Sequence, residues 1–99
     1  MPTINVTYIL AIDSPDTTVN RVACWLHEKK IPVDLFCTQV LASHTRLIII
    51  CELDCYAIGL TARRLRKVEG ITDLQCLIPK QFSLRSTPPA ILQLVHANQ

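Results

Sequence analysis

Residues 46–53 have the sequence RLIIICEL, and the five side chains from Leu47 to Cys51 are all apolar. A half-exposed strand alternates apolar and polar residues, whereas a strand covered on both faces is apolar at every position. We therefore predict a central strand over 46–53 that is covered on both faces. A second strand is expected over 33–41, and the Ala-Ser-His-Thr stretch at 42–45 is typical of the turn between them.

The N-terminal part of the chain predicts a strand followed by a helix. Apolar residues recur at every second position over 4–12, which is the period of a strand. Ser14 is then expected to cap a helix with its side chain, and Pro15 and Asp16 suit the first helical turn. An apolar stripe at 19, 22, 23 and 26 continues this helix to Lys29-Lys30, because Pro32 blocks further turns.

A second helix and a last strand follow the central strand. Asp54 is expected to cap a helix whose inner stripe is 58, 62, 65 and 68, and Glu69-Gly70 ends it. Residues 71–78 predict a strand, closed by Pro79. The order βαββαβ predicts an α+β, ferredoxin-like sandwich: an antiparallel four-stranded sheet with two helices on one face. The helix-free face leaves one apolar side of 46–53 to be covered, which we interpret as a sign of oligomerisation.

Composition limits the class of protein. Residues 1–78 are predicted to form one domain, and 79–99 a C-terminal tail whose stretch 88–97 would be a short helix docking on this domain or on a partner. The chain is 49% hydrophobic and 18% charged with a net charge of +2, which excludes disorder and argues against a dedicated nucleic-acid or membrane binder. No signal-peptide pattern begins the sequence, and five cysteines without a CxxC motif favour the cytoplasm.

Candidate chemistry is sparse. His27, His44 and His96 have no carboxylate or cysteine at ligand spacing, so we interpret them as solvated and expect neither a metal nor a cofactor. Cys51 and Cys55 are interpreted as two buried or half-buried small side chains. The loop after the first strand lacks the cysteines of copper carriers and the glycines and arginine of acylphosphatase-like catalysts, and no serine or cysteine nucleophile has a recognisable partner.

Two surface features have open interpretations. The basic stretch 63–67 is expected to be the solvated end of the second helix, with contact to an acidic partner as the alternative. Trp25 is the only tryptophan and lies beside the first helix's apolar stripe. It is equally suited to the edge of the core and to an interface.

Four segments carry a resemblance to a known family. They are Ile4 to Thr7, Ser14 to Val22, His27 to Val33 (HEKKIPV) and Leu65 to Ile71 (LRKVEGI). In order and spacing they resemble the ACT-domain family, small-molecule-sensing regulatory modules of amino-acid metabolism. Within that family the chain is most similar to the short small subunits of acetolactate (acetohydroxyacid) synthase.

The resemblance implies a non-catalytic subunit of branched-chain amino-acid biosynthesis. It would form a homodimer and bind the thiamine-diphosphate-dependent catalytic subunit of acetolactate synthase, raising or feedback-tuning its activity. Branched-chain amino acids are the family's effectors, bound at the dimer interface near the first strand–helix loop. The implied effector-binding residues are Asp13, Ser14, Pro15, Asp16, Thr17 and Thr18. The candidate interface residues are Trp25, Ile48, Ile50, Ile91 and Val95.

Other functions remain open beside this one. The family's effector loop usually contains a glycine that lets a ligand approach the backbone closely. Residues 13–21 contain none, so the sequence leaves open whether an effector binds. The first alternative is a free-standing ACT-type amino-acid sensor or protein-interaction module without a synthase partner. The second is a small enzyme on the same fold, for which no paired acid, base or nucleophile is found.

Overall fold

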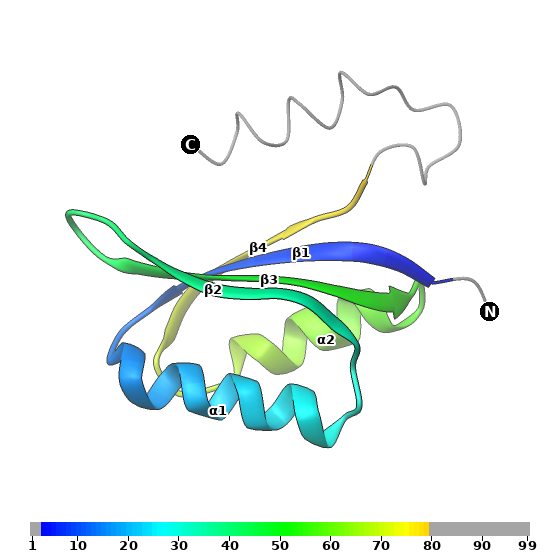
Figure 1. The fold of residues 1–99 in the computed structure, drawn as a ribbon, viewed down its shortest axis with the longest axis horizontal. Coiled ribbons are helices and arrows are strands. Elements are labelled where there is room, and N and C mark those ends of the chain that lie inside the picture. The colour runs from blue at the N-terminus through cyan, green and yellow to red at the C-terminus, as the bar shows by residue number, and fades with distance from the viewer. Residues whose placement is uncertain (1–2, 80–99) are drawn as a thin grey trace.

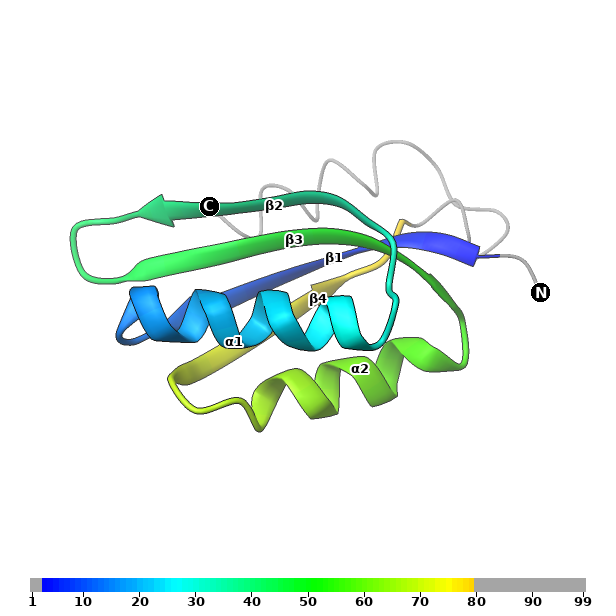
Figure 2. The same ribbon diagram turned by 60° about the horizontal axis from the view of Figure 1, so that its bottom comes forward.

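The structure is a computed structural model and describes residues 3–79. These residues form six elements: β1 (Thr3–Ile12), α1 (Pro15–Glu28), β2 (Val33–Val40), β3 (Thr45–Asp54), α2 (Ala57–Arg66) and β4 (Ile71–Leu77). The strands form one sheet in the order β2-β3-β1-β4, and every neighbouring pair is antiparallel. Both helices cover the same face of this sheet (Figures 1 and 2). The predicted ferredoxin-like fold is confirmed.

The central position of β3 is also confirmed. Ile49 lies opposite Tyr8 of β1 on one side and opposite Phe36 of β2 on the other. Because successive side chains of a strand point to opposite faces, β3 divides into two rows. Its odd-numbered residues 47, 49 and 51 are fully buried in the core on the helix side. Ile48 and Ile50 belong to the other face of the sheet and are partly buried.

The helix ends follow the predicted chemistry with small shifts. α1 ends at Glu28, and Lys30 leaves it in the left-handed conformation with φ +57°. Asp54 is not the N-cap residue of α2, which is Tyr56, but it supports the start of the helix from two residues earlier. Its Oδ1 accepts hydrogen bonds from the backbone N–H groups of Tyr56 (2.9 Å) and Ala57 (3.0 Å). α2 ends at Arg66, before reaching Val68. The predicted tail helix, with Ile91, Val95 and His96, lies outside the described residues.

The Tyr8 hydroxyl and the Cys51 thiol lie in the core, and Cys76 packs against it. The Tyr8 side chain is fully buried, and its hydroxyl donates a 2.8 Å hydrogen bond to the Ile58 carbonyl of α2. Burial raises the pKa of this hydroxyl, with smaller effects from Cys76 and Cys51. Cys51 is buried as predicted, but Cys55 is exposed, so that part of the prediction is wrong. Cys55 follows β3 in the turn before α2, where no element covers it.

The buried Cys51 thiol predicts a loss of stability at alkaline pH. Burial raises its pKa from 9.0 to about 11, helped by Cys76 and Asp34. Below pH 9 the thiol is neutral in both states, whereas between pH 9 and about 11 it ionises only in the unfolded chain. The free energy of unfolding should therefore fall as pH rises through this window, by on the order of 2 kcal/mol from this group.

Urea unfolding at a series of pH values measures this loss. Cys51→Ala should flatten the alkaline slope, whereas Cys37→Ala, at an exposed thiol, should leave it unchanged. Equal slopes in the wild type and Cys51→Ala would contradict the prediction.

Candidate functional site

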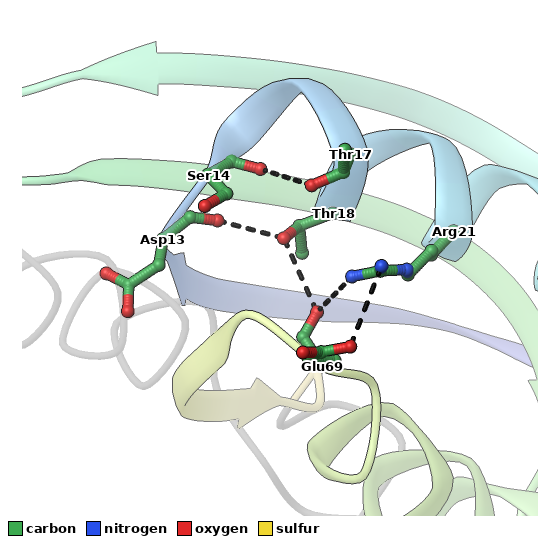
Figure 3. Close-up of polar contacts among 6 residues, drawn as sticks. All are labelled: Asp13, Ser14, Thr17, Thr18, Arg21 and Glu69. Carbon is green, nitrogen blue, oxygen red and sulfur yellow. Dashed lines mark hydrogen bonds and ion pairs between the residues drawn. The ribbon is translucent and has the colours of Figure 1, made fainter.

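The loop between β1 and α1 packs against the turn between α2 and β4. The Asp13 N–H donates a 2.7 Å hydrogen bond to the Gly70 carbonyl. The Thr18 hydroxyl lies 2.9 Å from the Asp13 carbonyl oxygen and 3.4 Å from that of Glu69, joining the two segments (Figure 3). The loop predicted to hold an effector is therefore fixed by residues about fifty positions further along the chain.

Ser14 does not cap α1 with its side chain, so that prediction is wrong. A capping side chain reaches the helix N–H groups from an extended backbone, whereas Ser14 is left-handed with φ 45° and ψ 63°. The Ser14 carbonyl oxygen accepts hydrogen bonds from the first turn of the helix instead. This oxygen accepts the backbone N–H groups of Thr17 (3.2 Å) and Thr18 (3.1 Å) and the Thr17 hydroxyl (3.2 Å).

The backbone of Ser14 predicts a stabilising substitution. Left-handed backbone costs a residue with a Cβ about 1–2 kcal/mol, and glycine avoids this cost although it loses more entropy on folding. Ser14→Gly should therefore raise the free energy of unfolding by about 0.5–1 kcal/mol in urea titrations. Ser43→Gly is the control, because Ser43 has no positive φ. A gain in stability at Ser43 equal to that at Ser14 would refute the argument.

The loop offers polar groups of both signs to solvent. Asp13 to Thr17 are exposed. Pro15 has no N–H, and Ser14 accepts those of Thr17 and Thr18, so Asp16 keeps the one N–H of residues 15–18 without a partner in the described chain. This N–H and the Ser14 hydroxyl suit a carboxylate, since the Thr17 hydroxyl already donates to the Ser14 carbonyl, and the two aspartates suit an ammonium group.

The loop does not enclose a ligand by itself. Its five exposed residues form an open surface, so a second surface is needed to exclude water from a bound amino acid. Thr18 is fully buried, and its hydroxyl supports the loop from the protein side. Effector binding by these six residues stays a prediction.

Three residues of this region were not recognised from the sequence. Gly70 has φ +100°, and a Cβ there would overlap the Thr18 hydroxyl and lie 3.3 Å from the Asp13 carbonyl oxygen. The sequence singled out Gly70 only as a helix terminator. Arg21 bonds the Glu69 carbonyl through Nη1 at 3.3 Å, and its Nη2 lies 3.6 Å from the Glu69 carboxylate. Arg21 and Glu69 lie 48 residues apart, so no local sequence pattern predicts that they interact.

The remaining candidates lie apart from the loop. Trp25 is partly buried and packs against the core. His27 on α1 and His44 in the β2–β3 turn are exposed, and His44 Nδ1 lies 2.8 Å from the Ser43 hydroxyl. Within residues 3–79 no cluster of three metal-ligating side chains occurs, and no helix of this part is long and apolar enough to cross a membrane.

Solved structures identify the fold. The chain is similar to the ACT domain of a GTP pyrophosphokinase from Chlorobium tepidum in its crystal structure, with a TM-score of 0.65 and 9% identity over 77% of this chain and 100% of that one. The solution structure of that domain gives a TM-score of 0.56 and 10% identity, over 77% and 85% of the two chains. An uncharacterised protein from Thermotoga maritima gives 0.63 and 12%, over 80% and 100%. Neither a protein-family model nor a curated protein matches the sequence.

Proposed function

From its ACT-domain fold, we propose that this chain is a non-catalytic regulatory module that works as a homodimer and binds the catalytic subunit of acetolactate synthase. There it would activate the synthase or tune it by feedback from a branched-chain amino acid. The fold is the observation that carries the regulatory part. The choice of synthase rests on the resemblance of segments 4–7, 14–22, 27–33 and 65–71 to its small subunits.

The homodimer is supported by the outer edge of β2. β2 pairs with β3 on one side, and no other strand of residues 3–79 pairs with it. Val33, Leu35 and Val40 on this strand are 38%, 42% and 80% exposed. Edge strands are commonly protected by charged residues, proline or irregular pairing. β2 has Asp34 and a register shift at its start, but residues 35–40 contain neither a charge nor a proline. A hollow of about 310 Å³ between α1 and β2, lined by Val33 and Phe36 among others, continues this unpartnered flank. A second copy pairing along β2 would cover both.

Charging the β2 edge should break the dimer. In Val33→Lys/Leu35→Lys each copy would have to bring two charged side chains into the joint and remove them from water, raising the dimer dissociation constant by more than about tenfold. Sedimentation at micromolar concentration measures the change. Gln75→Lys is the control, because Gln75 is exposed on the opposite edge strand β4. An unchanged dimer in the double variant, with dissociation instead in Ile48→Lys, would assign the contact to the helix-free sheet face and refute the β2 joint.

The proposed activity is tested by titration into the acetolactate synthase catalytic subunit from the same source, following acetolactate formation with and without valine. A saturable rise in rate is the expected result. Inhibition of the activated enzyme by valine would assign effector binding to this chain if Asp16→Ala weakened it. No change in rate and no co-elution would reject the synthase as partner.

A free-standing amino-acid sensor is the second candidate. It is favoured by the left-handed Ser14, because the loop keeps a backbone shape that glycine usually adopts although it contains no glycine. Calorimetric titration with valine, leucine and isoleucine in the absence of any synthase separates the two. Binding without an effect on the synthase would favour the sensor.

A further inference from the structure

A second cavity lies at the other end of the helix layer. It opens between the end of α1 and the start of α2, whereas the effector loop lies at the opposite ends of both helices (Figure 2). Its volume is about 450 Å³, within the range of about 300–1,000 Å³ that is usual for small-molecule sites. None of Asp13 to Thr18 lines it.

The walls of this cavity are largely apolar. Trp25 and Ile31 line it from α1 and the segment after it, Leu53 from β3, and Leu60 from α2. Leu60 is 51% exposed, although it lies on a helix whose other apolar side chains are packed in the core. An apolar body of a few carbon atoms would remove this surface from water.

The acidic and basic residues around the cavity differ in whether their side chains have hydrogen-bond partners. Asp54 Oδ1 accepts two backbone N–H groups at the start of α2, and Glu52 Oε1 lies 3.2 Å from the Thr3 hydroxyl. Lys29, Lys30 and Arg64 also line the cavity. The charged groups of these three side chains have no hydrogen bond or ion pair with residues 3–79. Both carboxylates keep their charge, so the lining has three cations against two carboxylates and a formal net charge of +1.

We propose that this cavity binds a small amphipathic carboxylate, with its apolar body against Trp25 and Leu60 and its anionic group near Lys29, Lys30 and Arg64. The lining favours an anion, because its three cations outnumber its two carboxylates and none of the three cationic side chains has a partner in the described chain. The site is separate from the effector loop, so it does not depend on the proposed regulation of a synthase.

Trp25 provides a direct readout, since it is the chain's only tryptophan and lines the cavity. The probe is 4-methylpentanoate, and its neutral counterpart 4-methylpentanamide has the same body without the charge. Titration of the full chain should give a saturable change in Trp25 fluorescence with the carboxylate. The amide should bind about tenfold more weakly, which corresponds to losing the attraction of the three cations. Backbone amide shifts of Ala57 and Leu60 in NMR spectra provide a second measurement.

Two adjacent arginines give a matched pair of variants. Arg64→Ala should raise the dissociation constant of the carboxylate about fivefold, whereas Arg63→Ala, on the same helix but outside the cavity lining, should leave it unchanged. Lys30→Gly should weaken binding similarly without unfolding the protein, because the left-handed backbone at this position favours glycine. Equal binding of the amide and the carboxylate, an equal effect of both arginine variants, or no saturable change in fluorescence or amide shifts would overturn the proposal.

Discussion

Ile49→Ala should lower the free energy of unfolding by about 3–4 kcal/mol, and Ile48→Ala by about 1 kcal/mol. The two residues are chemically identical neighbours on β3. Ile49 is fully buried beneath the helices, whereas Ile48 lies on the opposite face and is partly buried. Truncating Ile49 removes apolar contacts and leaves a cavity between Tyr8 and Phe36, which face it from the adjacent strands.

Urea unfolding of the two variants measures this difference. A domain of this size has a free energy of unfolding of roughly 5–15 kcal/mol, so the Ile49 variant should unfold at a much lower denaturant concentration than the wild type. Equal losses at Ile48 and Ile49 would contradict the assignment of the two faces. A larger loss at Ile48 would mean that the helix-free face is the better packed one in solution.

Gly70→Ala should lower the free energy of unfolding by about 3 kcal/mol. Part of this loss, about 1–2 kcal/mol, comes from a Cβ at φ +100°, a conformation that side chains rarely adopt. The remainder comes from overlap with the Thr18 hydroxyl and a tight approach to the Asp13 carbonyl oxygen. Because the Asp13 N–H donates a hydrogen bond to the Gly70 carbonyl, the substitution should also displace the loop between β1 and α1.

Gly59→Ala is the control for Gly70. Gly59 lies within α2, and a Cβ there would meet no atom within 4 Å. Alanine at this exposed helical position should raise stability by about 0.5–1 kcal/mol. In a Thr18→Ala background, Gly70→Ala should cost about 1 kcal/mol less, since the overlapping hydroxyl is gone. An unchanged cost in that background would place the strain in the backbone alone.

The order of the elements and the central position of β3 could be predicted because they follow from local patterns. Apolar residues at every position of 47–51 indicate a covered strand, and the stripe of α1 repeats at helical spacing. The support that Asp54 gives to the start of α2 could likewise be predicted, since its partners Tyr56 and Ala57 are two and three residues away. These signals lie within short windows of sequence.

The site escaped prediction where it depends on contacts between distant segments. Ser14 adopts a left-handed backbone although it is not a glycine, so its sequence gives no sign of this conformation. The contact between Gly70 and Thr18 brings together segments that are far apart in the sequence. Burial of Thr18 follows from that contact rather than from its neighbours in sequence. The positive cavity at Lys30 and Arg64 is also visible only when α1 and α2 lie side by side.

The pairing of β1 has a consequence for how the chain folds. β2 and β3 form a local hairpin, with Val40 opposite Thr45, so their loop closes at little entropic cost. β1 has no such neighbour: Thr3 pairs with Asp54 and Thr7 with Leu77. This raises the contact order, which slows folding relative to a helical bundle of the same length. During synthesis, the strand that leaves the ribosome first is therefore the last to gain both partners.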